Sequence, residues 1–126
     1  MDKFVKHYLI AALWSSVDDD FDYQQFGIDD FHPESVASAQ RDCDAFKARS
    51  GDLFTQACAL YLPHPDAGSG EASAGHDFWL TRNHHGAGFW DRKELGALGD
   101  QLTAICQTHF REVNLYVDDD GKVHIE

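Results

Sequence analysis

The chain opens with a helical pattern of apolar residues. Within residues 4–14 the apolar side chains recur every three to four positions, and Val5, Leu9 and Leu13 mark one stripe. Two serines and a run of aspartates follow and end the pattern. We therefore predict a buried first helix over residues 4–14.

Two further helices are predicted in the first half of the chain. Pro33 suits the first turn of a helix, and apolar residues then recur at helical spacing until Gly51. Asp52 is a suitable N-cap for a shorter helix that ends before Pro63. Residues 66–75, rich in Gly, Ala and Ser, are predicted to form a flexible connection.

The pattern changes in the second half. Residues 77–82 have the composition of a strand, residues 83–86 are typical of a turn, and residues 89–90 are again strand-like. These three segments predict a β-hairpin.

A helix and a second hairpin follow. Asp91 and Glu94 have the spacing of a capping box, which predicts a helix from there to His109. Apolar and polar residues then alternate on both sides of an Asp-Gly turn, which predicts a terminal hairpin over residues 113–125. The sequence therefore predicts one α+β domain over residues 1–126. A helical N-terminal half packs on a small antiparallel sheet, and the C-terminal half is ββαββ.

Charge narrows the classes of function. The 126 residues carry 22 acidic and 10 basic side chains, a formal charge of −12 at pH 7. This charge repels nucleic acid phosphates, so direct nucleic acid binding is not expected, whereas an acidic surface suits a basic protein groove. Cys43, Cys58 and Cys106 have no disulfide or metal spacing, and no membrane span is predicted, so we expect a cytoplasmic protein.

Two stretches resemble a known protein family. They read HYLIAALWSS at residues 7–16 and GHDFWLTRNHHGAGFWDR at residues 75–92. They are similar to small uncharacterised bacteriophage and prophage proteins with the pattern GHDFWLTRNxHGAGFWDR, a Leu- and Gly-containing helix and a DDG hairpin. The resemblance implies a phage origin and the host cytoplasm as compartment, and it brings no activity with it. His84 occupies the open position of that pattern, so His85 is the better candidate for a shared role.

Much of this motif can be explained by folding alone. Arg82 and Arg92 would pair with Asp77 and Asp91 across the hairpin, and the aromatic residues would pack in two layers. Folding does not explain why the turn residues, 82–88, should be so specified. A tip rich in His and Gly beside tryptophans is typical of a recognition loop.

An enzyme is the alternative hypothesis, although we favour a protein without catalysis. His85 would act as general base, Asp77 or Asp91 would orient it, and Arg82 or Arg92 would hold an anionic substrate such as a nucleotide. The sequence has no nucleophile elbow and no phosphate-binding loop. No metal or other cofactor is expected, because the histidines lack the spacing of a metal site.

The favoured function is a phage-encoded acidic accessory protein that binds a host protein or ribonucleoprotein complex. Its most concrete form is an anti-CRISPR-like inhibitor that mimics the charge of nucleic acid. No membrane partner is expected, and a homodimer through a strand edge is a third hypothesis. The expected binding residues are Trp79, Asn83, His84, His85, Trp90, Asp18, Asp19, Asp20 and Asp22.

Overall fold

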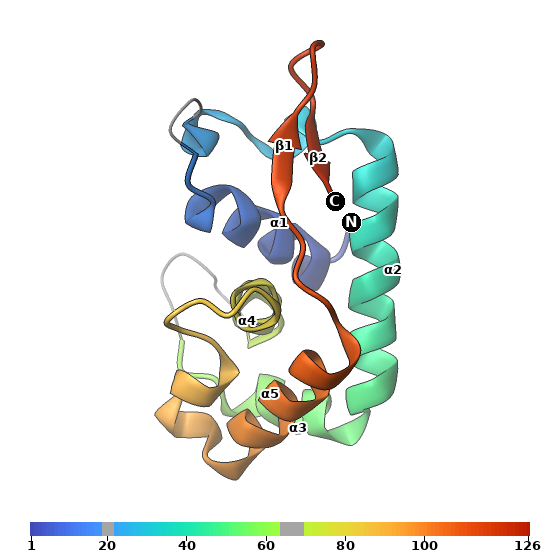
Figure 1. Cartoon of the computed structure of the whole chain (residues 1–126). Helices are drawn as coiled ribbons and strands as arrows, with labels where there is room; N and C mark the ends of the chain where they lie inside the picture. The colour runs from blue at the N-terminus through green and yellow to red at the C-terminus, as the bar shows by residue number, and fades with distance from the viewer. Residues whose placement is uncertain (19–21, 64–69) are drawn as a thin grey trace.

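The computed structural model describes residues 1–18, 22–63 and 70–126. Helices surround a central helix, and a small antiparallel sheet closes one end (Figure 1). The α-helices are α1 (Lys3–Ser15), α2 (Pro33–Ser50), α3 (Asp52–Leu60), α4 (Gly70–Arg82) and α5 (Ala97–His109), and the strands are β1 (Leu115–Val117) and β2 (Val123–Ile125).

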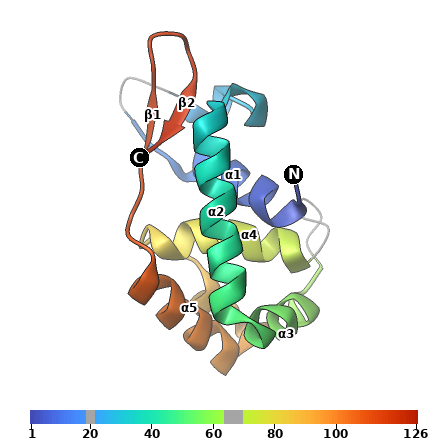
Figure 2. The ribbon, with the colours of Figure 1, turned by 90° about the vertical axis from the view of Figure 1, so that its right-hand side faces the viewer.

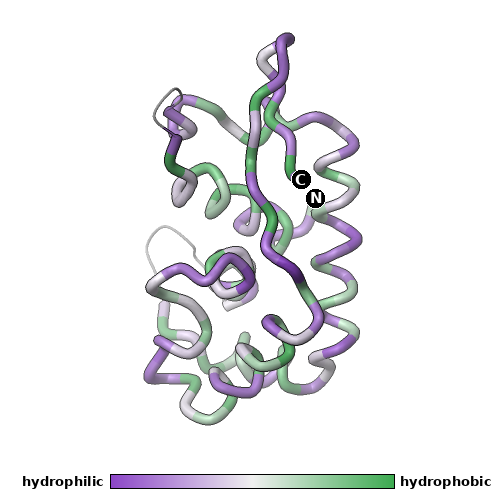
Figure 3. Tube along the Cα trace, viewed as in Figure 1, coloured by the Kyte–Doolittle hydropathy of each residue, from purple (hydrophilic) through white to green (hydrophobic). Residues whose placement is uncertain are grey.

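The helices of the first half form where they are predicted. Helix α1 is capped by Asp2, whose carboxylate accepts a hydrogen bond from the Val5 N–H at 2.9 Å. Helix α2 has proline in its first turn and ends at Gly51, whose φ of 51° favours glycine. Along α2, hydrophobic and hydrophilic residues alternate at helical intervals (Figure 3), and the predicted helices α1 and α2 are confirmed. Helix α3 also forms, but Gly51 and not Asp52 is its N-cap, and Asp52 is its first helical residue.

Helix α4 runs through the centre of the molecule. Figure 1 shows it end-on, with α1 on one side and α3 and α5 on the other, and Figure 2 shows α2 crossing α1 and α4. Between Ala72 and Arg82 every side chain except that of His76 is buried. The aromatic core packs around this helix: the Phe78 ring is stacked on Phe46 with centroids 4.4 Å apart.

The predicted hairpin of residues 77–90 is wrong. Residues 77–82 belong to α4, and Phe89–Asp91 form a 3-10 turn. A helix that is buried on all sides has no polar face, so its sequence lacks the helical period and its aromatic residues imitate a strand. The predicted flexible connection is also wrong over residues 70–75, which form the first half of α4, whereas residues 64–69 lie outside the described part.

Small residues allow α4 to approach its neighbours. A Cβ on Gly75 would overlap the backbone carbonyl of Phe4 in α1, and a Cβ on Gly70 would overlap that of Cys58 in α3. Glycine therefore sets the separation of these helices.

The terminal hairpin is confirmed, with Tyr116 paired to His124 in an antiparallel register. The Asp118 carboxylate accepts hydrogen bonds from the Asp120 and Lys122 N–H groups, both at 2.9 Å, and fixes the turn. The α+β class is therefore confirmed. The order of the second half is not ββαββ but α4, two 3-10 turns, α5, β1 and β2.

Two smaller features complete the fold. The predicted capping box at Asp91 does not start α5, because Asp91 ends a 3-10 turn and Gly96, with φ of 54°, precedes the helix. Within residues 1–18, 22–63 and 70–126, no helix combines the length and the apolar character that crossing a bilayer requires.

Candidate functional site

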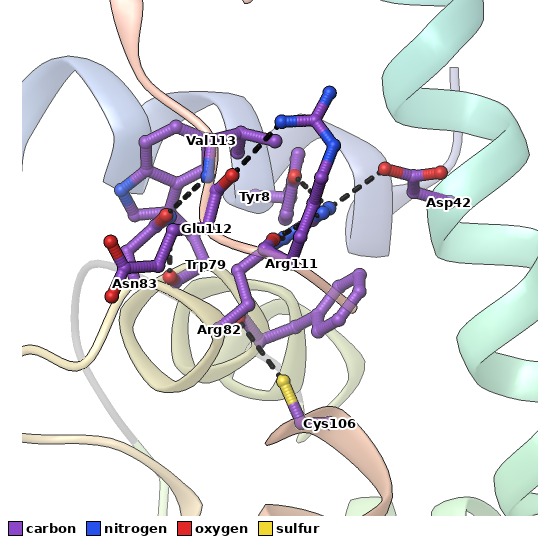
Figure 4. Close-up of polar contacts among 10 residues, drawn as sticks. Tyr8, Asp42, Trp79, Arg82, Asn83, Cys106, Arg111, Glu112 and Val113 are labelled. Carbon is purple, nitrogen blue, oxygen red and sulfur yellow. Dashed lines mark hydrogen bonds and ion pairs between the residues drawn. The ribbon is translucent and has the colours of Figure 1, made fainter. Parts of the chain in front are cut away.

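Arg82, the first basic residue of the motif, lies inside the protein with 2% of its surface exposed. Its Nη1 donates to the Tyr8 hydroxyl at 3.0 Å and to the Asp42 carboxylate at 2.7 Å. Its Nε and Nη2 both donate to the Arg111 carbonyl, at 3.0 and 2.7 Å (Figure 4). Arg82 thereby ties α4 to α1, to α2 and to the segment that follows α5.

The electrostatics of this cluster keep Arg82 charged. Burial acts to lower the pKa of Arg82, but Tyr8 and Asp42 outweigh it and raise that pKa. Burial also raises the pKa of the Tyr8 hydroxyl, which therefore stays protonated. A charged guanidinium with its donors occupied is a structural group, because it has little capacity left for a substrate.

Asp77 is the second buried charge of the motif, with 1% of its surface exposed. Its carboxylate accepts two hydrogen bonds from Arg92, at 2.9 and 3.1 Å, and one from the Tyr61 hydroxyl at 2.7 Å. The predicted pairing of Asp77 with Arg92 is confirmed, although it joins α4 to a 3-10 segment and not two strands. Burial, together with Asp77, raises the pKa of Tyr61.

Two predicted binding residues also hold the fold together. Trp79 is 2% exposed and its indole N–H donates to the Ser15 hydroxyl at 2.8 Å, so it offers no surface to a partner. The Asn83 carbonyl oxygen accepts from the Val113 N–H at 2.8 Å, which anchors the segment before β1. These contacts show that much of the motif is structural.

The rest of the motif closes the loop after α4. The Thr81 hydroxyl accepts a hydrogen bond from the Phe89 N–H at 3.1 Å. A Cβ on Gly88 would overlap that hydroxyl, so glycine lets the loop fold back on α4. The motif pattern GHDFWLTRN and GFWDR therefore corresponds to a buried helix and the segment that returns along it.

The tip of this loop carries two histidines. His84 is exposed, has a φ of 56°, and its Nε2 lies 3.5 Å from the Glu112 carboxylate. His85 is half-buried and lines a cavity of about 360 Å³ together with Asp18 and Glu112. The tip therefore leaves polar side chains at the surface, as does Asp91 farther along the motif.

The residues of the enzyme hypothesis do not converge. His85 lines the cavity of about 360 Å³. Asp77, Asp91 and Arg92 line a second cavity of about 500 Å³, which lacks His85, and Arg82 lines a third of about 500 Å³. Acid–base catalysis requires its groups within hydrogen-bond reach of one substrate, which this arrangement does not offer.

An apolar groove, which we call the Trp14 groove, adjoins the motif at the second of these cavities. Trp14 is 58% exposed, Leu62 is 66% exposed, and both line it. Trp90 is 47% exposed, and its indole nitrogen lies against Gly88 of the groove wall. The rest of the lining consists of Pro63, His76, Asp77, Leu80, Ala87, Asp91, Arg92, Lys93 and Glu94.

Sequence reasoning singled out Trp90 but missed Trp14 and Leu62. The available signal was the position of Trp14, which lies at the end of the first helical pattern and off its buried stripe. The predicted aspartates are placed in part: Asp18 and Asp22 are exposed, while Asp19 and Asp20 lie outside the described residues.

The described part of the chain shows neither a group of metal ligands nor a thiol with a lowered pKa. Among residues 1–18, 22–63 and 70–126, no three His, Cys, Asp or Glu side chains are grouped to hold a metal ion. Burial raises the pKa of Cys58 to about 11 and that of Cys106 to about 12. Thiols with such pKa values are poor nucleophiles at neutral pH.

Comparison with known proteins yields no relative. No family model, no curated protein and no solved structure matches the chain.

Proposed function

We propose that this protein is a phage-encoded accessory protein that acts by binding a basic surface of a host protein or ribonucleoprotein complex. The Trp14 groove is the contact surface in this proposal. The observation that carries it is the exposure of Trp14 and Leu62 in this groove, with the exposed Trp90 next to Gly88 of its lining, on a chain of charge −12.

Exposed tryptophans support a protein partner. Trp is enriched among the residues that dominate binding energy at protein interfaces, where it fills pockets at the centre of a contact. Trp14, Leu62 and Leu80 give the Trp14 groove its apolar lining, and its charged lining holds three acidic residues, Asp77, Asp91 and Glu94, against Arg92 and Lys93. An apolar centre with a charged rim is typical of specific interfaces.

Charge defines the kind of partner. A chain of −12 attracts basic surfaces over long range and accelerates their encounter, an effect that salt screens. Nucleic acid channels are basic surfaces of this kind. In its most concrete form, the proposed activity is therefore anti-CRISPR-like inhibition by occupation of such a channel in a host complex.

The test compares three tagged proteins in host lysate: the wild type, the double variant Trp14→Ala/Trp90→Ala, and the control Tyr116→Ala. Tyr116 is a matched control because it is also an exposed aromatic, at 41%, but lies on the hairpin. We expect a host protein that the wild type and the control retain and the double variant loses. With the purified partner, affinity should fall by at least about 30-fold, the loss typical of an interface hot spot. Equal retention by all three proteins would refute the Trp14 groove as the contact.

A second comparison tests the role of charge. Reversal of Asp18 and Asp22 to Lys should weaken retention of the same partner and reduce its dependence on NaCl concentration. Circular dichroism of each variant establishes that the fold is intact. Partner recovery that is unchanged by charge reversal and by salt would refute the electrostatic form of the proposal.

A further inference from the structure

A cavity on another part of the surface concentrates the basic side chains of this acidic protein. It measures about 500 Å³ and is lined by Arg49 at the end of α2, by Arg82 in α4, and by His109 and Arg111 at the end of α5. Its acidic residues are Asp42 and Glu126. Three of the five arginines of the chain thus face one cavity. We call it the arginine cavity.

The arginine cavity differs in charge from its neighbours. Two other cavities, around His85 and around Trp14, contain more acidic side chains than lysines and arginines. A further one, which holds Glu34 and Arg41, contains equal numbers. Among these four cavities of the described residues, cations exceed acids only in the arginine cavity.

Two guanidinium groups in the arginine cavity have no carboxylate partner. Asp42 is engaged by Arg82 at 2.7 Å, so its charge is compensated within the protein. Among residues 1–18, 22–63 and 70–126, Arg49 makes no ion pair, and the Arg111 guanidinium donates to the Glu112 carbonyl at 3.1 Å and to no carboxylate (Figure 4). Arg82 also holds the Arg111 carbonyl, which fixes the backbone from which Arg111 projects. This arrangement prepares two cations for an external anion.

We propose that the arginine cavity binds the phosphate group of a small molecule, independently of the partner-binding function. Guanidinium groups bind phosphate through paired N–H donors, and a phosphate dianion has enough oxygens to engage two arginines and His109 together. One arginine can engage both oxygens of a carboxylate. Several separate cations in one cavity therefore favour a phosphate over a carboxylate as the ligand. The volume lies within the range of sites for small ligands.

The same cations have a second, purely structural explanation. Arg49 lies in the last turn of α2 and His109 in the last turn of α5, where positive charge offsets the helix dipoles. A dipole role predicts lower stability when the cations are removed, in the absence of any ligand. It predicts no saturable binding of phosphate, so binding measurements separate the two explanations.

The experiment titrates inorganic phosphate and adenosine 5′-monophosphate into three purified proteins, followed by isothermal calorimetry and by ¹H–¹⁵N spectra. The proteins are the wild type, Arg49→Gln/Arg111→Gln, and the control Lys6→Gln/Lys122→Gln. Both double variants lose two positive charges, and all four side chains are exposed or line the surface. Ionic strength is held constant with NaCl, because bulk attraction is screened equally in all samples.

We expect saturable binding of both probes to the wild type and the lysine control, with shifts at the Arg111 and His109 amides. Affinity should fall at least about tenfold in the arginine variant, since each charged hydrogen bond contributes that much or more. Absence of saturable binding to the wild type overturns the proposal. Equal affinity of both double variants for phosphate also overturns it, because binding then depends on the net charge of the protein and not on the two arginines. Succinate binding as tightly as phosphate would overturn the assignment to phosphate.

Discussion

Individual side chains of the motif are specified by the hydrogen bonds that they complete inside the protein. Asp77, Thr81 and Arg82 are each at most 2% exposed, and each is bonded to a group from another part of the chain. In the described residues, no buried side-chain nitrogen or oxygen lacks a hydrogen-bond partner. A polar group without a partner would cost free energy at these positions, so substitutions that remove one member of such a pair are expected to destabilise the fold.

The Arg82 side chain provides the sharpest test at this scale. Arg82→Met keeps the aliphatic contacts but leaves the Tyr8 hydroxyl and the Arg111 carbonyl without their donor. We expect the free energy of unfolding to fall by about 2 kcal/mol, because two buried acceptors lose their donor, whereas the Asp42 side chain, 37% exposed, remains in contact with water. Urea denaturation followed by circular dichroism measures it. Arg41→Met is the control, because Arg41 is exposed on α2 and forms no ion pair with the residues that the structure describes. An equal effect of both variants would contradict the assigned role.

The residue scale also shows which contacts sequence could predict. The pairing of Asp77 with Arg92 was predicted from local charge and is found at 2.9 Å. The predicted pairing of Arg82 with an aspartate of the motif is wrong, because Arg82 pairs with Asp42, which lies 40 positions away and meets it only through the packing of α4 on α2. Local charge patterns identify neighbours along the chain, not the partners that tertiary packing brings together.

At the scale of elements, burial decides how well the sequence predicts the fold. Helices α1, α2 and α3 have polar faces, so their apolar residues recur at helical spacing and their positions were predicted. Helix α4 is buried on nearly every side, so no spacing was visible and its composition favoured a strand. The terminal hairpin was predicted because its Asp-Gly turn is a local signal. The predictable elements are therefore those that touch solvent.

The close crossing of α1 and α4 depends on Gly75, which has no side chain. Gly75→Ala would place a Cβ against the Phe4 carbonyl, and because backbone cannot rotate away, the helices must separate. We expect a loss of about 2 kcal/mol, typical of overpacking, despite the higher helix propensity of alanine. Gly86→Ala is the matched control, since no atom lies within 4 Å of its added Cβ. Thermal melting of both variants decides: similar midpoints would mean that the helices adjust freely.

The N-terminal cap of α1 gives the fold a defined acid sensitivity. Partial burial acts to raise the pKa of Asp2, but the Val5 N–H and Lys47 outweigh it and lower the pKa below its ordinary value of 3.8. A lowered folded-state pKa means that the stabilisation is complete above pH 3.8 and is lost as pH falls through the folded-state value.

Asp2→Asn tests this sensitivity, because asparagine retains a capping oxygen and removes only the charge. We expect the free energy of unfolding of the wild type to exceed that of the variant by about 0.5 kcal/mol at pH 7. The value is modest because Asp2 is partly exposed. The difference should disappear as the pH is lowered past the folded-state pKa. Urea midpoints of both proteins across that range measure it, and a difference that persists in acid would contradict the electrostatic origin.

For the molecule as a whole, the candidate site was harder to predict than the fold. The Trp14 groove combines residues from α1, from the end of α3, from α4 and from the loop before α5. No motif can reveal a surface assembled from such distant segments. The motif drew attention to the tip at His84 and His85, which is exposed in part, but most of its other residues proved to be buried.

The net charge of −12 lowers the stability of the folded protein through repulsion among its acidic side chains. Acidic side chains outnumber basic ones by 22 to 10, so folding brings like charges together and costs free energy. Salt shortens the range of this repulsion from about 30 Å at 0.01 M to about 8 Å at 0.15 M. The buried pairs of Arg82 with Asp42 and of Arg92 with Asp77 are screened much less. Added NaCl should therefore stabilise the protein, by on the order of 1 kcal/mol over this range.

Two double variants test whether the net charge causes this salt response. Asp119→Asn/Asp120→Asn reduces the net negative charge from −12 to −10, and Lys6→Gln/Lys122→Gln increases it from −12 to −14. All four side chains are exposed, so neither variant disturbs the core. The salt response of the urea midpoint should be smaller than that of the wild type in the first variant and larger in the second, because repulsion grows with net charge. If all three proteins responded equally, salt would be acting on burial or on the denatured state instead, and the acidic surface would carry no energetic cost that partner binding could relieve.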